Sequence, residues 1–143
     1  MGKKRIVKKG GETGNAGSRS ALARVSRRKM DTGVVFVEAT YNNTKMALAD
    51  TSGNVLAWSS SGSLGFTGAK KGTPFAAAKV GEFLGDRAAQ MGVKEVAIVV
   101  SGVGAGRESS IRAFSTKGIH IASIKDTTPV PHNGPRPPKP RRV

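Results

Sequence analysis

The feature that most restricts the fold of this sequence is the order of its hydrophobic patterns between residues 34 and 126. Three short runs rich in β-branched and aromatic residues come first, separated by turn-forming residues, which is typical of an antiparallel meander. A helical pattern, an apolar run, a second helical pattern and a last strand pattern follow. The expected strands are 34–40, 45–50, 55–60, 96–102 and 119–126, and the expected helices follow Thr73-Pro74 and begin near Glu108. The order βββαβαβ predicts an α/β fold with a single mixed β-sheet flanked by helices.

Glycine and proline mark the ends of both expected helices. Thr73-Pro74 is an N-cap followed by proline at the first helical position, and Gly92 stops the first helix. Gly118 stops the second helix in the same way. Gly81 and Gly85 lie inside the first helix, where each costs about 1 kcal/mol relative to alanine. We interpret these two glycines as a sign of close packing on the sheet.

The apolar run at 96–102 predicts a strand that is covered on both faces, because it lacks the alternation of a half-exposed strand. The strand–helix–strand unit at 96–125 predicts parallel pairing of the later strands through a right-handed crossover. The resulting sheet is therefore mixed, with an antiparallel first half and a parallel second half.

Most of the net charge lies outside this segment. The chain has 24 Lys and Arg against nine Asp and Glu, a formal net charge of +15. Residues 1–30 carry +9 of it, residues 127–143 carry +4 and residues 31–126 only +2. Terminal charges also occur as solvated tags, but two basic runs around a nearly neutral middle favour binding to a polyanion, most often nucleic acid. We expect a basic flexible N-terminal arm (1–30), an α/β RNA-binding domain (31–126) and an extended Pro/Arg-rich C-terminal tail (127–143).

The C-terminal tail cannot complete a regular element by itself. Residues 128–143 hold six prolines, which lack a backbone N–H and fix φ, so this stretch should follow an extended, polyproline-like path. Such a path loses little conformational entropy when it becomes ordered against RNA, and its arginines could contact successive phosphates. We expect its deletion to leave the domain folded while weakening the binding.

Two glycine-rich loops hold further candidate phosphate ligands. In 62–75, Lys70 and Lys71 precede a helix N-terminus, and Phe66 either stacks on a base or fills the core. In 101–109, three glycines open a helix with Arg107 beside them, which favours an anion site made by free backbone N–H groups. Their spacing is G-x-G-x-G and no G-K-[ST] pattern follows, so a nucleotide cofactor is not expected. The alternative is that these glycines only provide positive φ angles.

Catalytic and metal-binding patterns are weak. The chain has no cysteine, its acids form no paired motif, and His120 and His132 have no metal-ligand partner at a recognised spacing. The longest uncharged run, Thr51–Ala69, is too polar to span a membrane, and no apolar signal-peptide segment follows the basic start. We therefore expect a soluble cytoplasmic protein that is not an enzyme and has no cofactor, no small-molecule substrate and no membrane partner.

Several strings taken together resemble the family of the eleventh small-subunit ribosomal protein, in its bacterial form. They are YNNT (41–44), the turn and strand before Trp58, GFTGAKKGTPFAA (65–77), GVGAGRES (102–109) and DTTPVPHNGPRPPKPRRV (126–143), within a match over about residues 31–143. The resemblance implies ribonuclease-H-like topology without the catalytic acids. It implies a structural place on the small-subunit platform, bridging several ribosomal RNA helices and helping to form the Shine-Dalgarno cleft for messenger RNA. The seventh and eighteenth small-subunit proteins and a translation initiation factor are the implied neighbours.

The candidate RNA-binding residues come from the charge pattern and from this resemblance. The charge pattern contributes Arg24, Arg27, Arg28 and Lys29 in the N-terminal arm and Lys139, Arg141 and Arg142 in the tail. The resemblance adds Asn42, Asn43, Thr44, Gly65, Phe66, Gly68, Lys70, Lys71, Thr73, Gly102, Gly104, Gly106, Arg107, His132, Asn133, Gly134 and Arg136. The sequence departs from the family pattern at Val103 and Ala105, where prolines are expected, and at Pro135, where a cysteine is frequent.

Two other functions remain open at the level of sequence. A metal-dependent nuclease on the same fold would depend on Asp50 or Asp126. A nucleoid-type protein that coats DNA would need only the basic segments.

Overall fold

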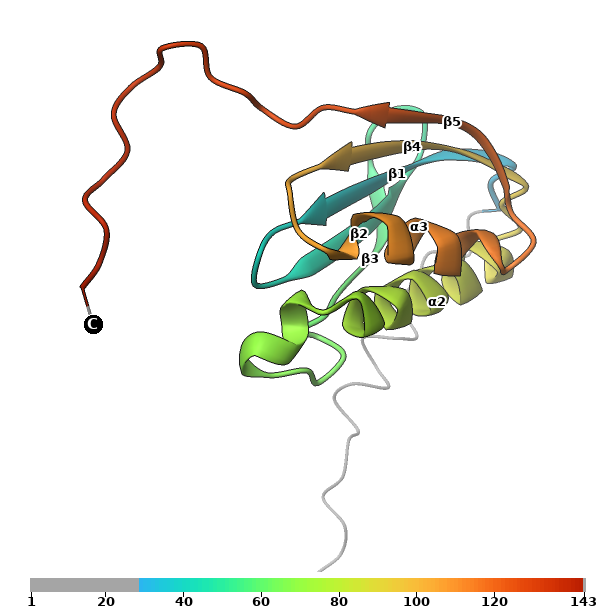
Figure 1. Cartoon of the computed structure of the whole chain (residues 1–143). Coiled ribbons are helices and arrows are strands. Elements are labelled where there is room, and N and C mark those ends of the chain that lie inside the picture. The colour runs from blue at the N-terminus through green and yellow to red at the C-terminus, as the bar shows by residue number, and fades with distance from the viewer. Residues whose placement is uncertain (1–28, 143) are drawn as a thin grey trace, which may run out of the picture.

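The computed structural model describes residues 29–142, in which five strands form one mixed sheet with two α-helices and one short 3₁₀ helix (Figure 1). The elements are β1 (Thr32–Ala39), β2 (Thr44–Ala49), β3 (Val55–Ser60), η1 (Gly68–Gly72), α2 (Pro74–Gln90), β4 (Glu95–Ser101), α3 (Gly106–Ser115) and β5 (His120–Asp126). The strand order across the sheet is β3-β2-β1-β4-β5. The predicted order βββαβαβ is confirmed, and η1 is an additional element that was not predicted.

Strand directions follow the prediction as well. β1, β2 and β3 are joined by tight turns and pair antiparallel. β4 pairs parallel with both β1 and β5. The sheet is therefore antiparallel on one side of β1 and parallel on the other, as the connections required.

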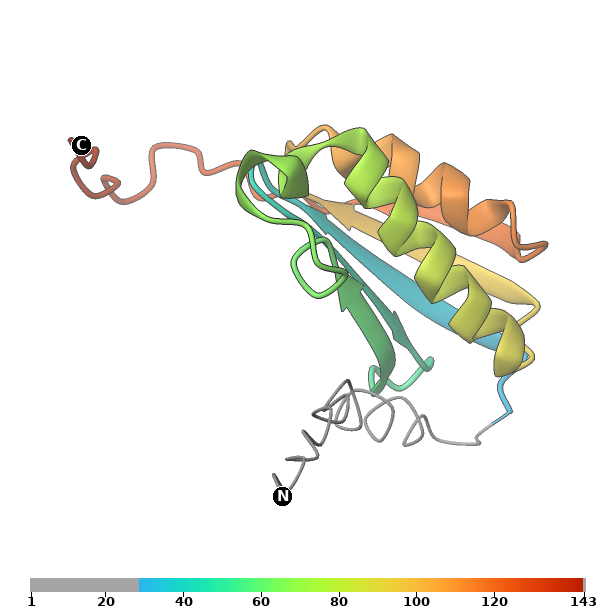
Figure 2. The same cartoon turned by 90° about the horizontal axis from the view of Figure 1, so that it is seen from below.

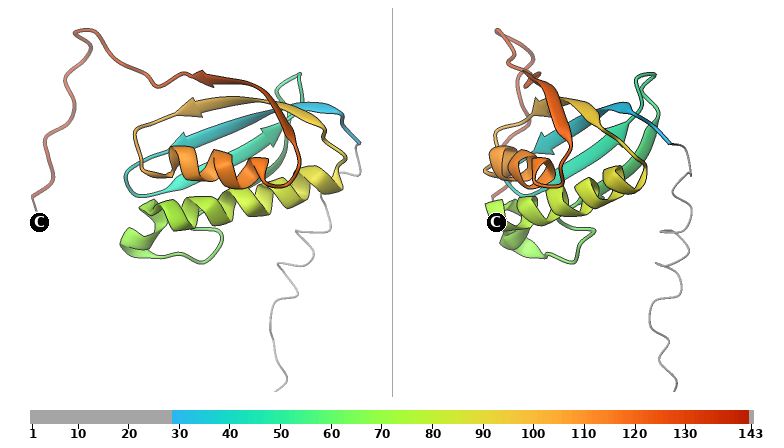
Figure 3. Two further views of the ribbon diagram at one scale, coloured as in Figure 1. Left: turned by 45° about the vertical axis from the view of Figure 1, so that its right-hand side comes forward. Right: turned by 90° about the vertical axis from the view of Figure 1, so that its right-hand side faces the viewer.

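Both α-helices lie on the same face of the sheet (Figures 2 and 3). α2 covers β2 and β3, α3 covers β1, and the two helices pack side by side. Every second side chain of the central strands points into this layer, because successive side chains alternate across a strand. The fully buried set includes Val35, Val37, Met46, Leu48, Val80, Leu84, Ile98 and Phe114.

The opposite face of the sheet is open, and the prediction that 96–102 is covered on both faces was wrong. Val96, Ile98 and Val100 are buried under the helices, whereas the intervening residues of β4 are only half-buried. The apolar run arose because neighbouring strands shield the open face enough for small apolar side chains to remain there. Phe36 of β1 and Trp58 of β3, each paired with Ala47 of β2, are 42% and 63% exposed on this face.

The two glycines inside α2 allow the second helix to approach. A Cβ atom at Gly81 would lie 2.3 Å from the Ser110 carbonyl oxygen of α3, and one at Gly85 would lie 2.5 Å from a side-chain carbon of Lys117. The prediction of close packing was right, but these contacts are with α3 and the residues after it, where the sequence predicted the sheet.

Candidate nucleic-acid interface

Both glycine-rich loops within residues 29–142 lie at one end of the sheet, which we call the loop end. β1, β4 and β5 run in the same direction and finish there, β3 also finishes there and β2 begins there. The loop end therefore gathers the β1–β2 turn (40–43), the segment 61–73 and the β4–α3 loop (102–105), and the C-terminal tail starts from it (Figure 1). Candidate residues far apart in sequence are thus neighbours in space.

The β1–β2 turn packs against both glycine-rich loops through its backbone. Gly104 N donates to Ala39 O at 2.8 Å, and a Cβ atom at Gly104 would lie 2.2 Å from Thr40 O. On the other side, a Cβ atom at Gly72 would lie 2.2 Å from Tyr41 O. Only glycine lets the backbones come this close. Gly104 and Gly72 are therefore needed for close approach, since neither has a positive φ angle.

The 62–73 loop presents cations that have no acidic partner. Lys70 is exposed and Lys71 half-buried at the end of η1, and no carboxylate within residues 29–142 forms an ion pair with either. Thr73 caps α2 as predicted, because its Oγ1 accepts from Ala76 N at 3.3 Å. The same hydroxyl donates to Lys70 O at 2.7 Å. The loop therefore places two lysines without a carboxylate partner in the described chain just before a helix N-terminus.

Two aromatic rings accompany these lysines. Phe66 is half-buried and meets Phe75 edge-to-face, with ring centroids 6.0 Å apart, so it is neither a core residue nor a freely exposed ring. Phe75, the second residue of α2, is 65% exposed and lies below the Lys79 ammonium at 5.7 Å. Tyr41 in the neighbouring turn is 79% exposed. Phe75 and Tyr41 are thus exposed aromatic residues at this end, and neither was predicted as a base-stacking residue.

The residues of the YNNT turn differ in burial. Asn42 is exposed and Asn43 half-buried, whereas Thr44 is fully buried. A Cβ atom at Gly106 would lie 2.2 Å from Thr44 Oγ1, so Thr44 lies directly under the first residue of α3. Asn42 is accessible to a partner, while Thr44 is part of the packing that holds α3 in place.

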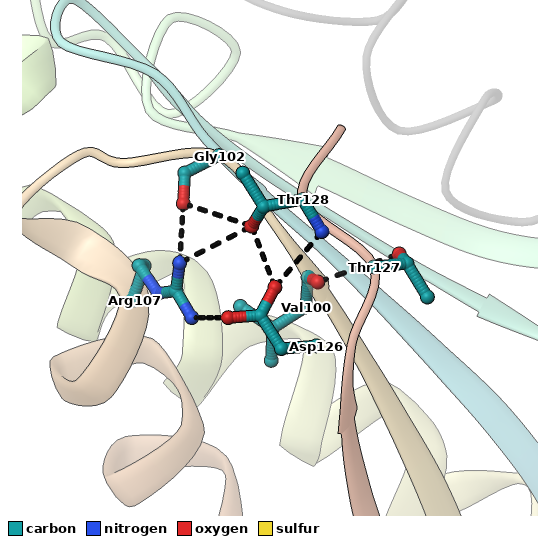
Figure 4. A network of polar contacts seen from close by, with 6 residues as sticks. All are labelled: Val100, Gly102, Arg107, Asp126, Thr127 and Thr128. Atoms are coloured by element: carbon teal, nitrogen blue, oxygen red, sulfur yellow. Dashed lines mark hydrogen bonds and ion pairs between the residues drawn. The ribbon is translucent and has the colours of Figure 1, made fainter. Parts of the chain in front are cut away.

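Arg107 is engaged within the protein (Figure 4). Its Nη1 donates to Gly102 O at 2.5 Å and to Thr128 Oγ1 at 3.3 Å, and its Nη2 forms an ion pair with Asp126 Oδ2. Asp126 Oδ1 in turn accepts from Thr128 N at 2.9 Å and from Thr128 Oγ1 at 2.5 Å. The predicted cation of the 102–106 loop therefore binds a carboxylate of the chain itself.

Electrostatics strengthen this network. The hydroxyl of Thr128, the guanidinium of Arg107 and the Thr128 N–H hold the pKa of the Asp126 carboxyl well below its usual range. The Asp126 side chain is ionised throughout the physiological range, so the ion pair with Arg107 is present there.

The C-terminal tail leaves from this network and runs away from the domain (Figure 1). Residues 129–142 are exposed, and no hydrogen bond or ion pair joins them to the rest of residues 29–142. Asn133 adopts a left-handed conformation with φ 54°, which Asn tolerates, and forms a bend with His132. The tail thus presents Gly134 and four cations, Arg136, Lys139, Arg141 and Arg142, to solvent.

The remaining predicted residues are the basic residues of the N-terminal arm and three loop glycines. Lys29 is exposed at the start of the described chain, while Arg24, Arg27 and Arg28 lie outside the described residues. Gly65, Gly68 and Gly102 all have positive φ angles. A Cβ atom at Gly65 or Gly68 would meet no neighbouring atom, whereas one at Gly102 would lie 2.2 Å from Ala39 O.

The two acids of the nuclease alternative are far from each other in the fold. Asp126 ends β5 at the loop end, whereas Asp50 follows β2 at the opposite end, where its Oδ1 accepts from Ser52 N and Asn54 N. The hydrogen bond from the Asn54 side chain, followed by those from the Asn54 and Ser52 backbone, lowers the pKa of the Asp50 carboxyl. Across residues 29–142, no three His, Cys, Asp or Glu side chains gather where they could hold a metal ion. None of the helices in that same range could span a membrane.

A small mixed-sheet domain with a cationic loop end and a basic tail defines an α/β protein suited to bind a polyanion. The family model described as Ribosomal protein S11 matches residues 33–142. A protein of Solibacter usitatus named small ribosomal subunit protein uS11 is 50% identical over 90% of this chain and 95% of its own length. Its namesake in Gloeobacter violaceus is 53% identical over 82% and 90%, and that of Sphingopyxis alaskensis is 50% identical over 85% and 95%. The chain therefore belongs to the ribosomal protein S11 family, a structural family without enzymatic activity.

Proposed function

We propose that this protein is a structural constituent of the small ribosomal subunit that binds small-subunit ribosomal RNA through its loop end and C-terminal tail. The observation that carries this proposal is the charge at the loop end: Lys70 and Lys71 have no acidic partner among residues 29–142, and the tail that starts there holds four exposed cations. The names of the relatives support the assignment to the small subunit.

RNA phosphates are the natural partners of these cations. Lys70 and Lys71 lie before the N-terminus of α2, where the first backbone N–H groups also favour an anion. Phe75 and Tyr41 are exposed aromatic residues on which unpaired bases could stack, as in other single-stranded RNA sites. The extended tail reaches further phosphates, so one loop end can bridge separate RNA helices.

The position within the small subunit and the neighbouring molecules are proposed from the resemblance of the sequence motifs. The proposed position is on the platform, where the protein would help to form the messenger-RNA cleft. The proposed neighbours are the seventh and eighteenth small-subunit proteins and an initiation factor. A cytoplasmic location follows from such a seat.

A salt titration tests the mechanism. Binding of the full chain to a small-subunit ribosomal RNA fragment should weaken steeply with salt, because each neutralised phosphate releases counterions. Replacing Arg136, Lys139, Arg141 and Arg142 by Gln should lower the log–log slope by about 3, at roughly 0.7–0.9 per phosphate. A flat slope for the native chain would contradict phosphate binding.

A duplex DNA of equal length separates this proposal from DNA coating. We expect the ribosomal RNA fragment to compete successfully against an excess of the duplex, and the protein to sediment with small subunits on a sucrose gradient. Equal affinity for both, with sedimentation alongside DNA, would favour the nucleoid-type alternative.

A further inference from the structure

The first residues of the tail follow a path that the local sequence dictates. Thr127 N donates to Val100 O at 2.8 Å, which extends the β4–β5 ladder by one residue. Thr128 N then donates to the Asp126 carboxylate, an Asx turn that bends the chain away from the sheet. Pro129 follows and restricts Thr128 to extended conformations. The string DTTP therefore specifies one local geometry where the strand ends.

Arg107 joins this turn to the rest of the domain. The guanidinium contacts the β4–α3 loop at Gly102 O, the last residue of β5 at Asp126 and the tail at Thr128 (Figure 4). Its planar fork suits this task, since separate N–H groups can donate to separate acceptors in fixed directions. Beyond Thr128, no hydrogen bond or ion pair holds residues 129–142 to the rest of the described chain.

We propose that Arg107, Asp126 and Thr128 form a latch that sets the direction in which the C-terminal tail leaves the domain. The latch residues are then positioning residues for RNA binding, and Arg107 is no phosphate ligand. This inference rests on the proposed function of the tail in binding RNA. It gives a role to the 102–106 loop that differs from the anion site predicted from its glycines.

The latch should lower the entropy that the tail loses when it binds RNA. An extended tail that is anchored in one direction searches a small volume, so less orientational freedom is lost when its cations meet phosphates. A tail released at Asp126 would keep its charge and its proline stiffness but would sample many directions. The affinity should therefore fall without any loss of charge in the tail.

The first experiment measures the direction of the tail in the free protein. The chain has no cysteine, so Cys introduced at Ala89 on α2 and at Val130 in the tail can carry two spin labels without background. We expect a narrow distance distribution in the parent, and a broad one with Asp126→Ala or Thr128→Val. Thr127→Val is the matched control, because Thr127 is held mainly by its backbone N–H, and should leave the distribution narrow.

The second experiment asks whether the latch acts through the tail. In the native background Asp126→Ala should weaken binding to the ribosomal RNA fragment by about tenfold, close to 1.4 kcal/mol. In the full-length chain with Arg136, Lys139, Arg141 and Arg142 replaced by Gln, the same substitution should have no further effect. Thr128→Val should behave in the same way and, as a nearly isosteric change, guards against a folding defect in Asp126→Ala.

Two outcomes would overturn the latch: distance distributions that stay narrow in both variants, or an equal loss of RNA affinity in both backgrounds. A different outcome would contradict the proposed function of the tail. If the chain with a neutral tail bound RNA as well as the native chain, the tail would not be an RNA arm. The spin-label distances would still decide whether the latch fixes its direction.

Discussion

The two glycine-rich loops of this protein look alike in sequence and differ in what their cations do. Both lie at the loop end, both precede a helix, and both place Lys or Arg beside that helix. In 62–73 the lysines have no carboxylate partner in the described chain, so they remain available to an external anion. In 102–106 the neighbouring Arg107 is bound to Asp126 and Thr128. Composition therefore does not tell whether a loop cation is available to an external anion, whereas its partners within the described chain do.

The backbones of the two loops differ where each loop begins, although both meet the β1–β2 turn closely, at Gly104 and at Gly72. Gly104 is clamped against the β1–β2 turn, whereas a Cβ atom at Gly62 would meet only a side-chain carbon of Lys71 at 3.7 Å and Ser60 Oγ at 4.0 Å. The 102–106 loop is thus a packed element, and the start of the 62–73 loop has room around it.

The largest expected effect is on stability, when one glycine in each loop is replaced by alanine. Gly104→Ala should lower the free energy of unfolding by about 3 kcal/mol, since the new carbon would collide with backbone atoms that cannot move away. Gly62→Ala should change it by no more than about 0.5 kcal/mol. Urea denaturation of the two variants measures both values. Equal stabilities would contradict the difference in packing between Gly104 and Gly62.

A smaller effect is expected from neutralising the free lysines. The double variant Lys70→Gln and Lys71→Gln should keep its stability, while the salt dependence of RNA binding falls by about 1.5 in log–log slope. Lys94→Gln is the matched control, because Lys94 is exposed at the opposite end of the sheet and pairs with Asp31. If the control lowers the slope as much as the double variant, RNA binding is not localised to the loop end.

The smallest effect is expected when the pH is changed, and it tests whether Asp126 controls the direction of the tail. A carboxyl whose pKa is lowered on folding contributes stability above its unfolded pKa, near 3.9, and loses it as the pH falls through the folded pKa. The pKa of Asp126 lies well below that ordinary value. The spin-label distance between α2 and the tail should therefore stay constant from pH 8 to pH 5. A distribution that broadens within this range would show that another group controls the tail.

Much of the fold could be predicted from sequence, because it depends on local signals. The capping pair Thr73-Pro74 and the alternation of the early strands specify elements within a few residues, and the structure reproduces both. The element against which each helix packs depends on residues far away in the sequence, so it cannot be predicted from the helix alone. Gly81 therefore indicated a close contact correctly, but the partner was α3 and could not be read from α2 alone.

The candidate site shows the same limit. Charge identified Lys70 and Lys71, of which Lys70 is exposed and Lys71 half-buried. The contact between Arg107 and Asp126 could not be predicted, because the two residues are nineteen positions apart and approach only when β5 pairs with β4. The string DTTP was the signal that could have revealed the Asx turn. Phe75 was missed because an apolar residue in the first turn of a helix ordinarily indicates a core contact.

The open face of the sheet also supplies an optical reporter. Trp58 is the single tryptophan of the chain, and its indole is largely solvated on the side that carries no helix. Its emission in the isolated protein should resemble that of indole in water. A shift to shorter wavelength during assembly would then reveal that another molecule covers this face, independently of any event at the loop end.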